Sequence, residues 1–307
     1  MTVYLSEYIN PAAEALLREQ AQVTDSFDDP ERIDAIILRN IPVTAELMDR
    51  CKNLKVIGKH GVGVNTIDLA AAKERGIRVI NTPTANADSV AEMTVALFLA
   101  LARKIPLADA NCGRGAYDNI APKELIGMEL GGKTLGQIGM GNIAQRIARI
   151  LREGFGCRVL GYDPFVSAED AAARGFEKVD DLFELLERSD LVNINVPLVK
   201  STERMISGEA FDHFRPGALF INAARGAVIS EEDLYSALKA GKLRAAACDT
   251  FVNEPPKGDN PLQSLPNFIA TPHIGGNTEE SLQRTGMEVV TETLRVLAGE
   301  APAHPVV

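Results

Sequence analysis

Short β-rich runs alternate with longer helical patterns along nearly the whole chain, and this alternation constrains the fold more than any other feature. It is typical of parallel sheets whose strands are joined by crossover helices. The first third contains strand candidates at residues 3–6, 35–38, 55–58 and 78–80. A second series begins near residue 133, with candidates at 134–138, 158–162, 191–196, 218–222, 245–248 and 268–270. Six strands with helices between them make a complete doubly wound sheet, so we predict an α/β fold.

Two long helical patterns frame the second series of strands. Ser89-Val-Ala-Glu92 has the form of a capping box and opens an apolar helix that we expect to reach about residue 104. Residues 278–297 form another helical pattern, too late in the chain to begin a domain of their own. We therefore expect the first helix to mark a domain boundary and the last one to pack on the N-terminal domain.

Composition and charge exclude several classes of function. Apolar residues make up 46% of the chain, which is ample for a buried core. The net charge is -10 and no run of basic residues occurs, so we expect neither a nucleic-acid partner nor a membrane surface. The longest apolar run is far too short to span a bilayer, and the N-terminus lacks a signal-peptide pattern, so we expect a cytoplasmic protein. The four cysteines lie far apart with no metal-binding spacing, so we expect no metal site.

A glycine-rich turn follows the strand candidate at 134–138 and leads into a helical pattern at 145–153. Gly139 allows a tight turn, Gly141 lets the backbone approach a pyrophosphate, and Ala144 is small enough for close helix packing. The N-terminus of the helix offers unpaired N–H groups and a positive dipole end to phosphates. Such a turn is weak evidence alone, because glycine-rich strand-to-helix turns also occur without ligands.

The next strand candidate strengthens the interpretation of this turn. It ends in Asp163, 24 residues beyond Gly139, where a ribose-binding acid is expected in a dinucleotide fold. A carboxylate at this position accepts from both ribose hydroxyls and repels the 2′-phosphate of NADP. The sequence therefore predicts NAD as the cofactor.

The carboxyl ends of the strands in the second series carry the candidates for chemistry, because ligands of open α/β sheets gather there. Arg225 follows the strand candidate at 218–222, and its guanidinium can hold a carboxylate in a two-point fork. His273 follows the last strand candidate, where an imidazole can exchange a proton with a substrate hydroxyl. Glu254 can reach that imidazole and keep it protonated for the reductive direction. We expect His213 and His304 to be structural or solvated.

Several spaced motifs make the chain resemble the D-isomer-specific 2-hydroxyacid dehydrogenases, and among them the catalytic core of D-3-phosphoglycerate dehydrogenases. They are Gly61-Val-Gly63-Val64, Asn81-Thr82-Pro83, Gly139-Met-Gly141, Tyr162-Asp163-Pro164, Asn222-Ala-Ala-Arg225-Gly226, Glu254-Pro255-Pro256 and Pro272-His273-Ile274-Gly275. The resemblance implies an Arg-Glu-His catalytic set, which falls on Arg225, Glu254 and His273. It also implies a flavodoxin-like substrate domain of residues 1–100 and 280–307, interrupted by a Rossmann NAD-binding domain of residues 101–279. A homodimer and an active-site cleft between the domains are implied as well.

The resemblance further assigns cofactor and substrate contacts. The implied cofactor contacts, in addition to the two glycines, are Thr82, Asn142, Ile143, Asp163, Ala223, Asp249 and Gly276. Asp249 would accept from the nicotinamide carboxamide. The implied substrate contacts, besides Arg225, are Lys59, His60, Gly61, Val62 and Gly63, with the backbone N–H groups of the loop holding the carboxylate. Lys59 and His60 are equally compatible with residues that merely end a strand.

The chain departs from phosphoglycerate dehydrogenases near the expected phosphate site. Those enzymes commonly have Arg and a small residue where this chain has Lys59 and His60, and Asp where it has Asn65. These differences concern the phosphate site and leave the expected reaction class unchanged. We expect a small anionic 2-hydroxy or 2-oxo acid as substrate, with 3-phosphoglycerate narrowly first, hydroxypyruvate or glyoxylate second, and a sulfonated analogue such as sulfolactate third. An NAD(H)-sensing corepressor-like protein of the same architecture is an alternative of another class, and NADH binding without turnover would distinguish it. Formate oxidation is a weaker alternative.

Overall fold

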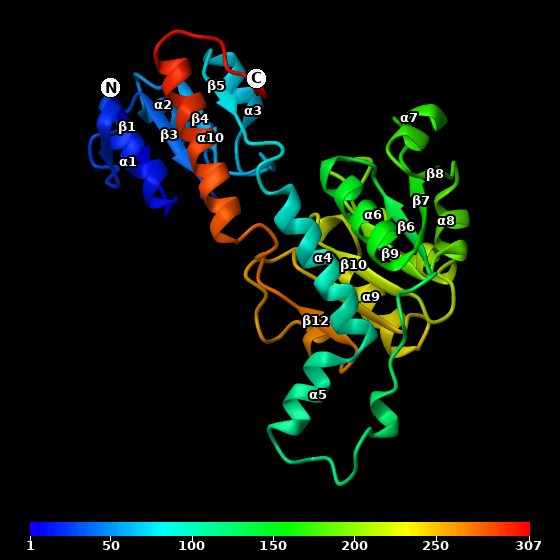
Figure 1. The fold of residues 1–307 in the computed structure, drawn as a ribbon. Coiled ribbons are helices and arrows are strands. Elements are labelled where there is room, and N and C mark those ends of the chain that lie inside the picture. The colour runs from blue at the N-terminus through cyan, green and yellow to red at the C-terminus, as the bar shows by residue number, and fades with distance from the viewer. The chain divides into compact units, whose positions relative to one another are not determined.

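A computed structural model describes residues 1–307 and divides them into two units (Figure 1). The first unit comprises Met1–Asn86 and Gly276–Val307, and the second comprises Ala87–Gly275. Each unit has its own parallel sheet with helices on both faces, which confirms the predicted α/β fold with one doubly wound domain inserted into another.

The first unit is built on a five-stranded sheet of order β2-β1-β3-β4-β5, in which every pair of neighbours is parallel. The strands are β1 (Thr2–Leu5), β2 (Gln22–Thr24), β3 (Ala35–Leu38), β4 (Val56–Lys59) and β5 (Arg78–Ile80). The helices are α1 (Pro11–Gln20), α2 (Ala45–Arg50), α3 (Leu69–Glu74) and α10 (Glu279–Leu297). Every residue of β3 and β4 is buried, as expected of parallel strands that helices cover on both faces.

The last helix returns to the N-terminal part of the chain, as predicted. Thr278 caps α10 by accepting a hydrogen bond from the Ser281 N–H, and the helix packs on α1 and β4. A Cβ atom at Gly286 would lie 2.9 Å from the Cβ of Ala13, so this glycine permits the close approach of the two helices. The chain end adds to the same sheet, because the Val306 N–H donates to the Val79 carbonyl at 2.7 Å.

The second unit is built on a seven-stranded parallel sheet of order β12-β11-β10-β9-β6-β7-β8. The strands are β6 (Thr134–Ile138), β7 (Arg158–Tyr162), β8 (Glu177–Lys178), β9 (Leu191–Ile194), β10 (Leu219–Asn222), β11 (Ala245–Cys248) and β12 (Phe268–Ala270). The helices are α4 (Ala87–Ala102), α5 (Ile105–Cys112), α6 (Asn142–Phe155), α7 (Ala168–Ala173), α8 (Leu182–Arg188) and α9 (Glu231–Lys239). The chain leaves the central strand β6 in one direction and returns beside it as β9, so the topological switch point lies between β6 and β9.

The helix predicted from the capping box differs from the helix that forms. The observed helix, α4, begins at Ala87. Ser89 therefore lies inside the helix, where it is 6% exposed, and does not cap its N-terminus. The apolar face of α4, which includes Val95 and Phe98, is buried in the same core cluster as residues of α6. The whole helix therefore belongs to the second unit, and the units divide after Asn86 and after Gly275 where the sequence placed the divisions after residues 100 and 279.

Three short elements were not predicted. Strands β2 and β8 are three and two residues long and lie at sheet edges, so they lack the apolar alternation that marks a buried strand. Helix α5 has no buried residue, so its sequence carries no amphipathic signal. Figure 1 shows α5 and the segment that follows it extending from the end of α4.

No helix in the structure is both long enough and apolar enough to cross a bilayer.

Candidate active site

Arg225 is held at the carboxyl end of β10 by a side chain of its own strand. The amide of Asn222, which is fully buried, accepts from the Ala224 N–H at 3.0 Å and donates to the Arg225 carbonyl at 2.9 Å. This pair of bonds fixes the backbone of the loop, and the Arg225 guanidinium is partly buried beside it. Burial lowers the pKa of Arg225, and the charge of Glu254 opposes that shift. Arg225 remains a cation, because an arginine titrates far above neutral pH.

A glycine brings the Arg225 loop against the segment that carries Glu254. A Cβ atom at Gly226 would lie 1.9 Å from the carbonyl carbon of Phe251, so only glycine allows the two backbones to meet. The Phe251 N–H in turn donates to Glu254 Oε1 at 3.0 Å. The two predicted residues are therefore adjacent through backbone packing that neither motif reveals by itself.

Glu254 and His273 form a hydrogen-bonded pair. Glu254 Oε2 lies 2.9 Å from His273 Nδ1, and the two side chains are 36% and 44% exposed. Burial raises the pKa of Glu254, but the hydrogen bonds from His273 and the Phe251 N–H, with the charges of His273 and Arg225, bring it below its usual value. Glu254 is thus an ionised partner that occupies one imidazole nitrogen and leaves Nε2 for a ligand. The structure brings the predicted set of Arg225, Glu254 and His273 together.

Asp249 shapes the loop that presents His273. Its carboxylate is 2% exposed and accepts from the Thr271 hydroxyl at 2.6 Å and from the N–H groups of Ile274 and Gly275 at 2.9 and 2.8 Å. The Asp249 carbonyl also accepts from the His273 N–H, and His273 has a left-handed backbone with a φ of 56°. The role predicted for Asp249 toward the nicotinamide carboxamide remains a prediction, and the structure shows a further one in ordering this loop.

The predicted phosphate turn has the local geometry that a dinucleotide needs. Gly139 has a φ of 86°, and a Cβ atom there would lie 2.5 Å from the carbonyl oxygen of Asn195, so no other residue fits. A Cβ atom at Gly141 would meet nothing within 4 Å, which leaves open space above the backbone. Helix α6 begins with Asn142 and Ile143 and has no side-chain cap, so its first N–H groups are available to phosphate oxygens. These residues fit an NAD molecule.

Asp163 lies at the end of β7, beside this turn. Its carboxylate accepts from the Met140 N–H and the Phe165 N–H, each at 3.0 Å, and it is partly exposed. These bonds hold the acid next to the turn while lone pairs of both oxygens remain for ribose hydroxyls. Ala223, another predicted cofactor contact, is 9% exposed at the end of β10 on the same sheet edge.

The remaining predicted contacts lie in the first unit. Thr82 is 1% exposed, and its hydroxyl accepts from the Gly61 N–H at 3.0 Å. Thr82 therefore orders the predicted substrate loop, and the Gly61 amide is already used within the protein. The N–H groups of Val62 and Gly63 are the donors to consider for a carboxylate. Gly276 also belongs to this unit, where a Cβ atom would meet Asn86 at 3.3 Å.

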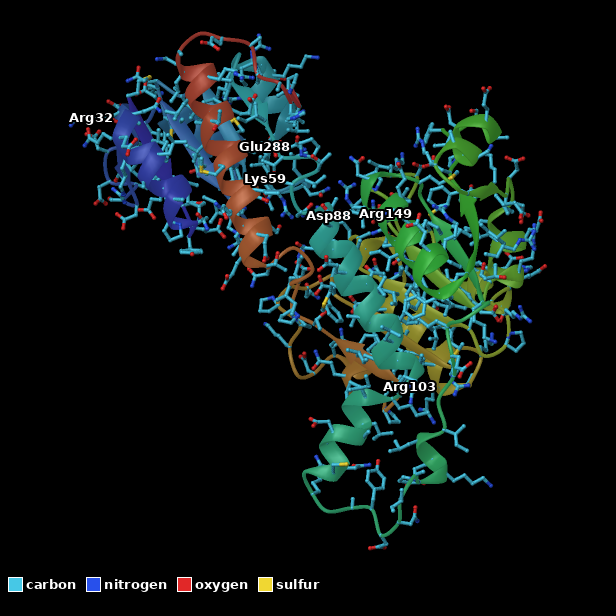
Figure 2. The ribbon with its side chains drawn as sticks, viewed as in Figure 1. Arg32, Lys59, Asp88, Arg103, Arg149 and Glu288 are labelled. Carbon is cyan, nitrogen blue, oxygen red and sulfur yellow. The ribbon has the colours of Figure 1, made fainter.

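Lys59 ends β4 and His60 follows it directly, and both residues are 7% exposed. Figure 2 labels Lys59. Burial and the charge of Arg39, with a further contribution from Lys59, lower the pKa of His60 to about 4, although backbone hydrogen bonds oppose this shift. His60 is therefore neutral near pH 7, and its Nε2 atom is buried without a hydrogen-bond partner. Lys59 is the cation of this pair.

Arg39 is a charged residue of this region that the sequence reasoning missed. It follows β3 directly and acts electrostatically on His60. Glu7, which follows β1, accepts from the N–H groups of Arg39 and Asn40 at 2.7 and 2.6 Å and so fixes the start of that loop. The sequence does carry a signal for Arg39, because this residue directly follows the strand predicted at 35–38.

The other two histidines have ordinary partners. His213 stacks on Phe183 with ring centroids 4.1 Å apart, and its Nδ1 lies 2.7 Å from Glu187. His304 Nε2 lies 3.6 Å from Glu288, which Figure 2 labels. Both interactions fit the structural role expected of these residues.

Residues 95–275 match the family model described as the NAD binding domain of the D-isomer specific 2-hydroxyacid dehydrogenases. The chain belongs to this family. The matched segment carries the glycine turn, Asp163 and the Arg-Glu-His set, so NAD is the cofactor that these residues fit.

Relatives of this 2-hydroxyacid dehydrogenase family member carry more than one name. A D-3-phosphoglycerate dehydrogenase of Methanocaldococcus jannaschii is 46% identical over 268 residues, which are 87% of this chain and 50% of that protein. A hydroxypyruvate reductase of Thermotoga maritima is 38% identical over 307 residues, covering 96% of this chain and 98% of that protein. The chain spans about half the length of this phosphoglycerate dehydrogenase and of the one from Archaeoglobus fulgidus, which is 42% identical.

A solved structure of the family has the same fold. The D-lactate dehydrogenase of Aquifex aeolicus, complexed with NAD and lactic acid, is 28% identical and has a TM-score of 0.85. The match covers 98% of this chain and 96% of that one.

Proposed function

We propose that this chain is an NAD-dependent dehydrogenase that interconverts a D-2-hydroxy acid and its 2-oxo acid. The observation that carries the proposal is the Glu254–His273 pair with Arg225 beside it, on the same sheet edge as the dinucleotide turn. Glycine turns and ribose-binding acids occur in many oxidoreductases. A positioned imidazole, an ionised partner and a carboxylate-binding cation suit hydride chemistry on an α-oxo acid in particular.

The residues divide the work of the reaction among them. NAD(H), which the glycine turn and Asp163 would hold, would supply the hydride donor or acceptor for the reacting carbon of the substrate. Arg225 holds the α-oxo acid in a two-point contact and so fixes the reacting carbon. His273 gives a proton to the carbonyl oxygen during reduction and takes one from the hydroxyl during oxidation. Glu254 fixes the tautomer of His273 through Nδ1 and stabilises the imidazolium.

The first unit supplies the groups that we propose for recognising the rest of the substrate. Backbone N–H groups of Val62 and Gly63 are the proposed donors to the carboxylate, in a loop ordered by Thr82 and by the bond from Asn81 Nδ2 to the Val62 carbonyl. Lys59 and Arg39 provide positive charge at the ends of neighbouring strands. Such charge favours a substrate with a second anionic group.

We therefore place 3-phosphoglycerate and phosphohydroxypyruvate first among substrates. Hydroxypyruvate and glyoxylate come second, and a sulfonated analogue such as sulfolactate comes third. The names of the two relatives support the first two classes, and the two cations favour a charged substituent. The neutral His60 adds hydrogen-bonding capacity but no charge to the region.

Turnover by the purified protein tests the proposal. NADH oxidation would be measured with phosphohydroxypyruvate, hydroxypyruvate, glyoxylate and sulfopyruvate and compared by kcat/KM. A preference of at least about tenfold for phosphohydroxypyruvate supports the phosphate-bearing substrate. Equal or better turnover of hydroxypyruvate or glyoxylate makes the protein a broader 2-oxo acid reductase. NADH binding without turnover of any 2-oxo acid would contradict the enzymatic proposal.

We also propose that the protein forms a homodimer through the segment after α4. Helix α5 has no buried residue, and the exposed apolar side chains Ile105, Ile120 and Ile126 are 52%, 98% and 64% accessible. Large apolar side chains left exposed along one surface segment are typical of surfaces that another subunit covers. Light scattering of wild type and Ile120→Glu tests this, and a monomeric wild type at micromolar concentration would contradict it.

A further inference from the structure

A chain of buried amide side chains lies at the switch point of the second sheet. Gln137 of β6 and Asn193 of β9 are paired in register and are both fully buried. Asn193 Nδ2 donates to Gln137 Oε1 at 2.9 Å. The residues two positions before them on the same face of the sheet, Leu135 and Leu191, are buried in an apolar core cluster. Buried amides cost stability relative to apolar side chains of the same shape, so their presence in a parallel sheet needs a reason.

Both amides donate to Asn195, the residue that directly follows the second of these strands. Asn195 Oδ1 accepts from Asn193 Nδ2 at 2.5 Å and from Gln137 Nε2 at 3.3 Å. Asn195 is only partly buried, so the chain of amides runs from the closed interior of the sheet to its carboxyl edge. Because the Asn195 Oδ1 atom accepts from both of these donors, the two N–H groups of the same amide remain for other acceptors.

Asn195 also borders the phosphate turn. Its N–H donates to the Ile138 carbonyl at 2.8 Å, and its own carbonyl oxygen is the atom that a Cβ at Gly139 would strike. The residue therefore lies at the carboxyl ends of β6 and β9, the place where an open α/β sheet binds its ligand. The phosphates and ribose hydroxyls of a dinucleotide offer acceptors there.

We propose that Asn195 binds the phosphate–ribose part of NAD(H) through its amide N–H groups. Gln137 and Asn193 are positioning residues, which fix the orientation of that amide before the cofactor arrives. A fixed donor loses less freedom on binding than one that must first choose between two amide orientations. This inference rests on the dinucleotide-binding role of the second unit and does not depend on the identity of the 2-oxo acid.

Replacement of Asn195 by its isosteric acid tests the contact. Asn195→Asp exchanges the donors for a negative charge, so the Kd of NADH, measured by fluorescence titration, should rise at least about tenfold. The Kd of ADP-ribose, measured by calorimetry, should rise by a similar factor, because ADP-ribose lacks only the nicotinamide. In turnover, KM for NADH should rise while KM for the 2-oxo acid stays within about twofold.

A matched control is available on the opposite edge of the same sheet. Asn267, which precedes β12, donates to the Arg244 carbonyl at 3.3 Å and lies at the amino ends of the strands. Asn267→Asp makes the same chemical change there, and we expect wild-type affinity for NADH and ADP-ribose. An equal loss in both variants would point to a general charge effect and would overturn the proposal.

The positioning role has a separate test. The double variant Gln137→Met and Asn193→Leu replaces both buried anchors by apolar groups of similar size, which should leave thermal stability nearly unchanged or higher. The freed Asn195 amide should then bind NADH several-fold more weakly. Wild-type affinity in both this variant and Asn195→Asp would overturn the inference. If the wild type itself failed to bind NADH, the dinucleotide role would fail instead, so the two failures are distinguishable.

Discussion

At the carboxyl edge of each sheet, a carboxylate orders a loop, but the two loops present different groups. In each, a carboxylate accepts backbone N–H groups and so fixes a loop, Asp249 in the second unit and Glu7 in the first. The loop fixed by Asp249 presents a hydrogen-bonded acid–imidazole pair. The loop fixed by Glu7 presents Arg39 beside a neutral imidazole with an unpartnered Nε2 atom. The second edge therefore carries groups suited to proton transfer, and the first carries positive charge suited to binding an anion.

Removal of the proposed proton-transfer group, His273, should have the largest effect on catalysis. His273→Gln keeps a hydrogen-bonding side chain but loses the titrating one, so kcat/KM should fall by a factor on the order of 10³. The Kd of NADH should stay near the wild-type value, because the imidazole is not proposed to hold the cofactor. Steady-state kinetics with the best 2-oxo acid measures the first and fluorescence titration the second. Retention of most activity would mean that the assigned acid/base is wrong.

Removal of a cation from the first edge should change specificity instead of chemistry. Lys59→Gln should lower kcat/KM for phosphohydroxypyruvate by about 10- to 100-fold, because a charge-assisted contact to the phosphate is lost. Turnover of glyoxylate, which has no second anionic group, should change much less. Lys55→Gln is a matched control, since Lys55 is exposed and pairs with Asp34 before the same strand. Equal losses with both substrates would place Lys59 outside a phosphate site.

Substitutions at two glycines of the second unit should distinguish an effect on cofactor binding from an effect on packing. Gly141→Ala adds a methyl group where no atom lies within 4 Å, so stability should be unchanged, while the Kd of NADH should rise by about tenfold. Gly226→Ala places its methyl group against the Phe251 backbone and should destabilise the fold by about 1–3 kcal/mol. Thermal unfolding and NADH titration distinguish the two effects. Unchanged affinity in Gly141→Ala would contradict the proposed path of the pyrophosphate.

The smallest expected effect is the pH dependence of stability that Glu254 contributes. Its pKa is lowered in the folded protein, so its contribution is present above the unfolded-state value near 4.5 and is lost as the pH falls through the folded value. Because the side chain is partly exposed, we expect a contribution on the order of 0.5 kcal/mol. Urea unfolding of wild type and Glu254→Gln between pH 3 and 7 measures it. A constant difference across that range would show that the pair does not stabilise the fold.

From the sequence alone we could predict the strands of both sheets, apart from two short edge strands, and select Arg225, Glu254 and His273, which the structure brings together. Buried parallel strands are mostly apolar and end at loops, so their positions, and the residues that follow them, can be predicted from the sequence. Asp163 and the glycine turn could be identified for the same reason, because their function depends on local spacing.

The contacts between distant segments, and the hydrogen-bonding groups that already have a partner within the protein, followed only from the tertiary structure. Gly226 against Phe251, Thr82 on the Gly61 N–H, and Arg39 near His60 each join segments that are distant in sequence. The affiliation of α4 was decided in the same way, because an apolar helix face fits any core until packing selects one. Burial and hydrogen-bond partners depend on such non-local contacts, and a pattern of residue types does not specify them.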